Sequence, residues 1–308
     1  MNFSTKYTVR TDLADEVIEG LRKKEGKTGD GITFKRDNIH GICIDTINVE
    51  NESAGRDIGK PQGKYITVTT GEIWRYDKDS FENAALVISD ILRKMLPDGL
   101  CLVACLGNDK ITADAIGPLT ADSLIVSRHI KLNDKELFSS LGLGECACIV
   151  PGVMGDTGAE AFELIQGAVE KLHPSSVIVI DALASRDVSR LAKTVQISDS
   201  GIHPGAGVGN ARHEISCKTL GVPTIAVGVP TVVEALTLSL DLLSEALENE
   251  KEVYGFVEQK LSQNMGRFFV CPKECDKIIR SMAKLIGYSL NFALHKDMTI
   301  SDIDEFLS

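Results

Sequence analysis

The chain of 308 residues carries 44 acidic and 33 basic side chains, a formal net charge of −11 and a sequence pI near 5.1. No block of Lys or Arg forms a phosphate-binding stripe, so the composition argues against a protein that binds nucleic acid directly. No apolar run reaches the roughly 18 residues of a membrane span. With 43% hydrophobic residues, the totals predict a globular protein with a sizeable core and no membrane segment.

Residues 1–30 lack an apolar stripe, so we expect a loose N-terminal extension that ends in a solvated helix end and a loop. Strand composition marks Gly41–Val49 and Tyr65–Thr70, which a long turn-rich connection joins. Helical spacing follows over residues 79–96, where Asp79 or Ser80 is placed to cap the helix.

Strand and helix patterns alternate from residue 100 onward. Continuous apolar strands that alternate with helices predict a parallel or mixed sheet covered on both faces. The simplest account is a single α/β domain with an N-terminal extension. We expect strands at residues 100–107, 146–152, 176–183, 194–198 and 224–230, and helices after residue 114 and over residues 156–173, 231–247 and 274–294.

Eight cysteines are present, but they lack the spacing of a zinc site. Most stand in apolar runs such as "LCLVACLG", and the "CPKEC" stretch has no second pair of ligands. The polar N-terminus does not have the pattern of a secretory signal. We therefore expect a cytoplasmic protein with free thiols and no metal or other cofactor. The eight are Cys43, Cys101, Cys105, Cys146, Cys148, Cys217, Cys271 and Cys275.

Two aspartates follow different predicted strands, where open α/β sheets bind their ligands. Asp114 comes shortly after the strand at 100–107, and Asp181 ends the run "SVIVI". If these strands are neighbours, the two carboxylates share a proton, because close like charges do not both ionise cheaply. Such a pair activates water and protonates a leaving group. The spacing leaves open the alternative that each aspartate caps a helix.

Two triplets spell the active-site signature of pepsin-like proteases. They are Asp156-Thr157-Gly158 and Asp199-Ser200-Gly201. In the pepsin fold, such triplets belong to two long β-rich halves, whereas here only 43 residues separate the two aspartates, and that interval holds a helix and a buried strand. We expect Asp156 or Thr157 to be the N-cap of the next helix, and Asp199 to begin a Gly-rich loop.

The loop "GAGVGN", Gly205–Asn210, lacks the full G-x-G-x-x-G spacing of a nucleotide-binding turn. We interpret it as a loop that lines the site. His203 and His213 are candidate bases, with a structural role as the alternative for each. There is no G-x-S-x-G motif and no cysteine in an activated setting, so nucleophilic hydrolysis has little support.

Several long blocks of the sequence resemble the germination protease family of spore-forming bacteria. They occur in the same order, and the likeness runs from Tyr7 to about Leu236. The blocks are "YTVRTDLADE", "GNDKITADAIGP", "PGVMGDTGAEA", "VIVIDALASRDVSRLAKTVQISDSGIHPGAGVGN" and "LGVPTIAVGVPTVVEAL".

The resemblance implies an endopeptidase that initiates degradation of small acid-soluble spore proteins during germination. It implies an α/β fold similar to the hydrogenase-maturation endopeptidases, a homotetramer, and a location in the forespore and spore core. It also implies a zymogen that cleaves itself near its N-terminus. In this chain, residues 1–10 would be the pro-segment and residues 11–308 a single peptidase domain. The cleavage region would be Tyr7, Thr8, Val9 and Arg10.

The family is regarded as an atypical aspartic peptidase. Its aspartates fall in the "TxDxxGP" and "IDAL" blocks, which here contain Asp114 and Asp181. Position 156 is usually Gln in the family pattern, so Asp156 adds a charge near the site. The candidates for supporting roles are Asn108, Thr112, Arg186 and His203.

Two other readings stay open. "LGNDKITADAIG" is similar to the strand-end pattern of the hydrogenase-maturation endopeptidases, which grip nickel in their substrate. A metal-linked peptidase of that type is therefore one alternative. A non-catalytic protein that binds the spore proteins is the other.

Overall fold

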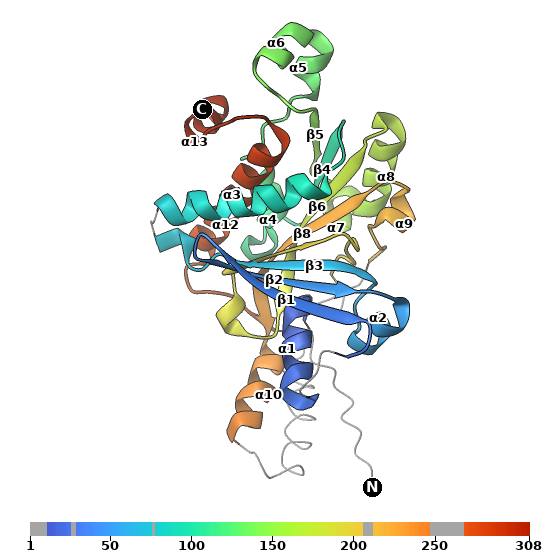
Figure 1. Cartoon of the computed structure of the whole chain (residues 1–308). Coiled ribbons are helices and arrows are strands. Elements are labelled where there is room, and N and C mark those ends of the chain that lie inside the picture. Colours follow the sequence, from blue (N-terminus) through green and yellow to red (C-terminus); the bar gives the residue numbers. More distant parts are fainter. Residues whose placement is uncertain (1–10, 26–28, 76–77, 206–211, 247–267) are drawn as a thin grey trace.

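A computed structural model describes residues 11–25, 29–75, 78–205, 212–246 and 268–308. Over these residues the strands form one mixed sheet in the order β1-β2-β3-β7-β8-β6-β4-β5, and β9 pairs with β8. Helices cover both faces (Figure 1), so the predicted three-layer α/β architecture is confirmed. The strands are β1 (Ile32–Ile39), β2 (Ile42–Val49), β3 (Gly63–Thr69), β4 (Cys101–Cys105), β5 (Cys146–Ile149), β6 (Ser176–Ser185), β7 (Thr194–Ser198), β8 (Thr224–Glu234) and β9 (Phe269–Val270).

The sheet has a parallel half and an antiparallel half. β5, β4, β6 and β8 run parallel to one another, whereas β1, β2, β3, β7 and β8 pair antiparallel in that order. Every residue of β4 is buried, as expected for a parallel strand that is covered on both faces. The two halves therefore meet where β7 pairs with β8.

One face of the sheet packs against the long helices α3 (Lys78–Met95) and α12 (Cys275–Leu294) and the short helix α4 (Ile116–Ala121). Figure 1 shows α3 and α12 lying side by side across the strands. Alternate strand residues such as Ile178 and Ile180 point into this core, which is continuous across the sheet.

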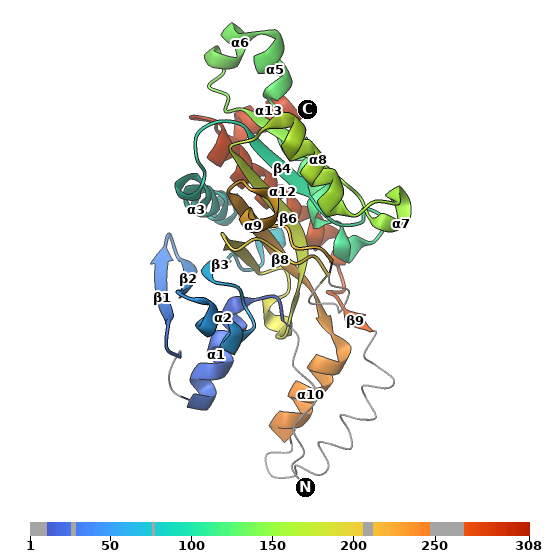
Figure 2. The same ribbon diagram turned by 90° about the vertical axis from the view of Figure 1, so that its right-hand side faces the viewer.

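The opposite face carries two separate groups of helices, which Figure 2 shows apart from each other. α8 (Ala161–Leu172) and α9 (Cys217–Leu220) cover β4, β5 and the first half of β6. α1 (Ala14–Glu25) and α2 (Glu52–Ile58) cover β1, β2 and the start of β3. Neither group of helices covers the middle of this sheet face, where residues of β6, β7 and β8 line a pocket.

The remaining elements are short or lie at the periphery. α5 and α6 form the projection at the top of Figures 1 and 2. Within the described ranges, no helix combines the length and apolar character needed to span a membrane. The short or peripheral elements are η1 (Ile73–Arg75), η2 (Thr112–Asp114), α5 (Arg128–Asn133), α6 (Lys135–Ser140), α7 (Met154–Thr157), η3 (Val188–Arg190), α10 (Ala235–Ala246) and α13 (Ile300–Leu307).

The prediction of a loose N-terminal region was wrong for its described part. Residues 14–25 form α1, and Leu13 and Ile18 next to its start are fully buried. The turn-rich connection between the first two predicted strands also contains a helix, α2. Asn51 caps it by accepting a hydrogen bond from the Ala54 N–H at 2.9 Å. Strand β1 had not been predicted.

The helix predicted over residues 156–173 is divided in two. Gly158, with φ of 75°, ends α7 in the left-handed conformation. The N-cap of α8 is Glu160, whose capping box with Glu163 takes the place expected for Asp156 or Thr157. The predicted cap was therefore wrong.

Two strands are longer than predicted. β6 continues past Leu183 to Ser185, and β8 continues past Pro230 to Glu234, because the two strands pair with each other over this extension. α10 therefore begins only at Ala235, not at residue 231 as predicted. The helix expected after Asp114 is replaced by the shorter α4, α5 and α6.

Candidate active site

A pocket of about 510 Å³ opens on the sheet face between the two helix groups. Its floor comes from alternate residues of four neighbouring strands, whose side chains point to the same face. Apart from Tyr65 and Leu183, this part of the face carries polar or small side chains, in contrast to the apolar clusters on either side. The floor residues are Tyr65 of β3, Gln196 and Ser198 of β7, Ala226 and Gly228 of β8, and Asp181 and Leu183 of β6.

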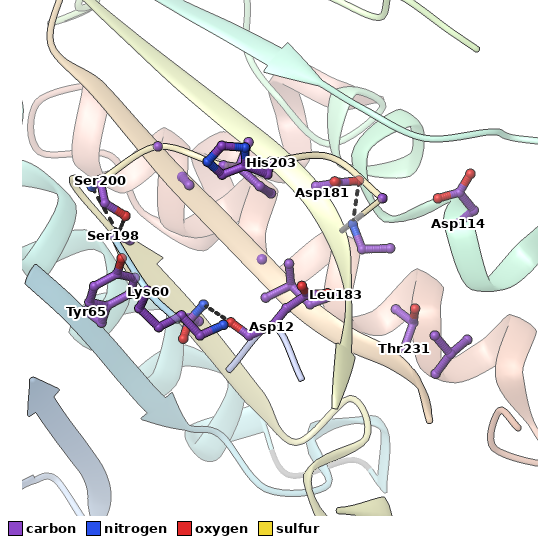
Figure 3. A pocket seen from close by; sticks show the side chains of 18 of the residues that line it. Asp12, Lys60, Tyr65, Asp114, Asp181, Leu183, Ser198, Ser200, His203 and Thr231 are labelled. Atoms are coloured by element: carbon purple, nitrogen blue, oxygen red, sulfur yellow. Dashed lines mark hydrogen bonds between the residues drawn. The ribbon is translucent and has the colours of Figure 1, made fainter. Parts of the chain in front are cut away.

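The walls come from segments that are far apart in the sequence. Figure 3 shows Asp181 and Asp114 on one side of the pocket, with Lys60, Tyr65, Ser198 and Ser200 on the other. The wall segments are the N-terminal arm with Asp12, residues 59–61 after α2, η2 with Ile111, Ala113 and Asp114, the loop after β7 with Ser200, Gly201, Ile202, His203 and Gly205, and Thr231, Val232 and Phe269 at the far end.

Asp181 lies on the floor, only 6% exposed. The pairing of β6 with β4 ends at Ile180, so Asp181 is the first β6 residue beyond the carboxyl end of β4. Its Oδ1 accepts a hydrogen bond from the Ala182 N–H at 2.9 Å. Burial raises the pKa of Asp181 well above its usual value, and the nearby charge of Asp114 raises it further.

Asp114 stands at the end of η2, on the loop that follows β4, and it is partly buried. The Asn108 N–H donates to its carbonyl oxygen at 3.0 Å, and its own N–H donates to Ile111 O at 2.8 Å. Burial raises the pKa of Asp114 to about 6, while the Asn108 backbone and the charge of Arg212 partly oppose this rise. The structure therefore places two carboxyl groups with raised pKa values in the lining of one pocket, one from β6 and the other from the loop after the neighbouring strand β4.

Two predicted supporting residues, Asn108 and Thr112, hold the loop of Asp114 without lining the pocket. The Asn108 Oδ1 accepts the Lys110 N–H at 2.9 Å, which closes a turn. The Thr112 hydroxyl donates to Asp276 of α12 at 2.7 Å. These contacts tie the loop to itself and to α12.

Arg186 does not reach the pocket. Its Nε and Nη2 donate to the carboxylate of Asp241 in α10 at 2.7 and 2.6 Å. Its backbone N–H donates to Glu16 of α1 at 2.8 Å. Arg186 thus connects the segment after β6 with two helices.

The two candidate histidines occupy different places. His203 lines the pocket, and its Nε2 lies 3.8 Å from the carboxylate of Glu214. His213 lies outside the lining and is mostly exposed, with Nδ1 2.5 Å from Glu160 and its ring stacked on Phe162. The hydrogen bond with Glu160 raises the pKa of His213.

The aspartates of the two pepsin-like triplets also lie outside the pocket lining. The Asp156 carboxylate forms an exposed ion pair with Lys110 at 2.9 Å. The Asp199 Oδ1 accepts the Lys64 N–H at 2.7 Å. The candidates Tyr7, Thr8, Val9 and Arg10 and most of the "GAGVGN" loop lie outside the described residues, whereas Gly205 lines the pocket.

The structure adds Asp12 and Lys60 to the pocket, which the sequence had not singled out. The Lys60 Nζ donates to the carbonyl oxygen of Thr11 at 3.0 Å, and burial lowers the pKa of Lys60. Asp12 lies in the "YTVRTDLADE" block, which resembles the germination protease family, and this was the one feature of the sequence that could have indicated it. No feature of the sequence indicated Lys60. In the described part of the chain, no three His, Cys, Asp or Glu side chains gather as a metal site.

Fold and site define an α/β protein whose pocket is lined by two carboxyl groups with raised pKa values, near the carboxyl ends of parallel strands. The sequence model of the family described as germination protease matches residues 11–250. The germination protease of Clostridium perfringens is 38% identical over 325 aligned positions, covering 98% of this chain and all of that protein. Those of Caldanaerobacter subterraneus and Bacillus velezensis are 36% and 34% identical, and each alignment covers at least 95% of both chains. The chain belongs to the germination protease family and is therefore a peptidase.

Proposed function

We propose that the protein is an endopeptidase that initiates degradation of small acid-soluble spore proteins during germination, with Asp114 and Asp181 as its catalytic residues. One observation carries this proposal: in a chain of the germination protease family, these two carboxyl groups line one pocket and both have raised pKa values. The pocket is open and lies across a sheet face, where a peptide segment can enter.

The proposed mechanism is that of an atypical aspartic peptidase. Asp181 is the more deeply buried carboxyl group and holds the shared proton, whereas Asp114, with a pKa of about 6, is largely ionised at neutral pH. Asp114 accepts a proton from water as the water attacks the scissile carbonyl. Asp181 donates its proton to the carbonyl oxygen, which gives a tetrahedral gem-diol. As the C–N bond breaks, Asp114 passes the proton taken from water to the leaving nitrogen, and Asp181 takes a proton back from a gem-diol hydroxyl.

The supporting residues have different parts in this proposal. Asn108 and Thr112 fix the loop that carries Asp114, and His203 offers a polar contact to the substrate from the pocket wall. Arg186 supports the fold around the site, through its ion pair with Asp241, and has no direct part in the reaction.

The remaining features implied by the resemblance belong to the same proposal. The protein is made as a zymogen, residues 1–10 are its pro-segment, and self-cleavage falls near Tyr7–Arg10. Residues 11–308 form the peptidase domain, which assembles as a homotetramer in the forespore and spore core. The hydrogen bond from pocket-lining Lys60 to Thr11 supports self-cleavage, because it places the chain just after the pro-segment beside the site.

The direct test is to incubate the purified protein, trimmed of residues 1–10, with a small acid-soluble spore protein and to weigh the fragments by mass spectrometry. We expect internal cleavage at a small number of bonds, unchanged by a metal chelator. Binding without cleavage would contradict the proposal and support a non-catalytic protein. Loss of cleavage with chelator, restored by added metal, would support a metal-linked peptidase.

A further inference from the structure

One buried hydroxyl group of the pocket has no hydrogen-bond partner. Thr231 lines the pocket and is only 1% exposed, yet its Oγ1 meets no donor or acceptor in the part of the chain that the structure describes. The other hydroxyl groups of the lining are bonded. The Tyr65 hydroxyl donates to the carbonyl oxygen of Pro61 at 2.8 Å, and those of Ser198 and Ser200 hydrogen-bond to each other at 2.6 Å. A buried polar group without a partner destabilises the free protein, so its presence in a pocket indicates a ligand that supplies the partner.

Thr231 stands at an irregularity in β8. The pairing of β6 with β8 matches Leu183 to Pro230 and then Ala184 to Val232. Thr231 has no counterpart in β6 and is therefore the extra residue of a β-bulge. A bulge interrupts the alternation of side chains along a strand and re-aims the side chain that it carries. The bulge explains why Thr231 and the next residue, Val232, both line the pocket.

Thr231 belongs to the same part of the pocket as the carboxyl pair. Asp181 is paired with Gly228 of β8, shortly before the bulge. The short helix η2, which carries Asp114, lies against both β6 and β8. Figure 3 shows Thr231 on the side of the pocket that holds Asp114, away from Lys60. A peptide whose scissile bond reaches the carboxyl pair therefore passes beside Thr231.

The main chain of a peptide is the ligand that matches a lone hydroxyl group at this place. Every residue of a peptide except proline carries an N–H donor and a C=O acceptor, and these groups lose water when the peptide enters a pocket. A hydroxyl group both donates and accepts, so Thr231 can bond either of them. Because a threonine side chain has several staggered arrangements, rotation about χ1 can turn Oγ1 toward the cavity that the side chain lines.

We propose that Thr231 is a substrate-binding residue whose hydroxyl group hydrogen-bonds the main chain of the peptide that the carboxyl pair cleaves. This inference rests on the proposed function, in which Asp114 and Asp181 cleave a protein substrate. The bulge in β8 serves the site by bringing this hydroxyl group to the pocket, and the free protein carries the group without a partner until the substrate binds.

Thr231→Val tests the hydroxyl group alone, because valine has nearly the same shape. We expect KM for a small acid-soluble spore protein to rise about tenfold and kcat to stay within about twofold, because the contact holds the peptide equally before and during the reaction. The Tm should be no lower than that of the wild type, because the free protein loses no hydrogen bond. Thr231→Ser keeps the hydroxyl group, so its KM should stay within about threefold of the wild type.

Thr67 of β3 offers a matched control. It is also 1% exposed and its hydroxyl group also lacks a partner among the described residues, but it lies outside the pocket lining. Thr67→Val should therefore have a Tm no lower than that of the wild type and an unchanged KM. The same change of chemistry is thus made inside and outside the site.

A wild-type KM in Thr231→Val would overturn the inference, and so would a KM in Thr231→Ser as high as in the valine variant. A clearly lower Tm or a failure to fold in Thr231→Val would show a structural role, and a fall in kcat at unchanged KM would show an effect through the carboxyl pair. Either result would also overturn it. If a folded Asp114→Asn or Asp181→Asn cleaves normally, the proposed function fails instead. If those two are inactive while Thr231→Val keeps the wild-type KM, only the inference about Thr231 fails.

Discussion

Gly107 and the backbone of Asp114 are so close that a Cβ on Gly107 would lie 1.9 Å from the Asp114 carbonyl oxygen. Gly107 also has a φ of 116°, which side-chain-bearing residues rarely adopt. Gly107→Ala should therefore displace the loop that carries Asp114. We expect kcat/KM to fall about a hundredfold or more, because a shift of about 1 Å in a catalytic group costs that much.

A second glycine provides the control for this prediction. Gly158 also has positive φ, 75°, but an added Cβ would meet no atom within 4 Å, and the residue lies outside the pocket lining. Gly158→Ala should cost about 1 kcal/mol of folding free energy and leave kcat/KM within about twofold. Equal activity losses in the two variants would contradict a specific role for Gly107.

Asp114 should also set part of the pH dependence of stability. Its pKa in the folded state is about 6, above the 3.8 that is usual for an aspartate in an unfolded chain. Folding therefore favours the protonated form, so this contribution is complete below about pH 4 and is lost as pH rises through 6. The side chain of Asp114→Asn stays neutral at every pH. Its Tm should therefore be roughly 4 °C above that of the wild type at pH 7 and equal to it at pH 4. A difference in Tm that does not change with pH would contradict the raised pKa.

The ion pair of Arg186 and Asp241 should stabilise the fold, not the reaction. It is bidentate and partly buried, and it joins the segment after β6 to α10. We expect Arg186→Ala and Asp241→Ala each to lower Tm, with a coupling of about 1 kcal/mol in the double-mutant cycle. The kcat/KM of each should stay within about threefold. Additive stability effects together with a tenfold loss of kcat would give Arg186 a direct part in catalysis.

The two histidines should respond differently to substitution. His203 lines the pocket, so His203→Ala should reduce kcat/KM by about three- to tenfold through a lost substrate contact. His213 pairs with Glu160 at the exposed surface, so His213→Ala should leave kcat/KM within about twofold. Steady-state kinetics of the two variants checks both, and the reverse order would contradict the placement of the site.

The parallel half of the sheet was the most predictable part of the molecule. Continuous apolar runs such as Ser176–Ile180 mark strands that are buried on both faces, and the polar residue that follows this run lines the pocket. Asp181 was found in this way, and Asp114 follows the neighbouring strand β4. The local sequence pattern was enough here because each of these strands is a continuous apolar run, which can be recognised without knowing its tertiary contacts.

Features that depend on tertiary contacts were missed or misplaced. α1 is rich in charges, and its helix forms because the few apolar residues near Ile18 are buried against β1 and β2. Gly158 divides the helix predicted from Asp156, and the pairing of β6 with β8 extends both strands past their apolar runs. Lys60 lines the pocket and donates to the carbonyl oxygen of Thr11, a contact between distant segments that no local pattern encodes.

The central claim is that Asp114 and Asp181, and not the aspartates of the pepsin-like triplets, perform the cleavage. The most direct measurement compares four single variants, Asp114→Asn, Asp181→Asn, Asp156→Asn and Asp199→Asn, on one small acid-soluble spore protein, with folding checked by circular dichroism. We predict a loss of about a thousandfold or more in kcat for the first two and activity within about threefold of wild type for the last two. Near-normal cleavage by a folded Asp114→Asn or Asp181→Asn variant would contradict the account.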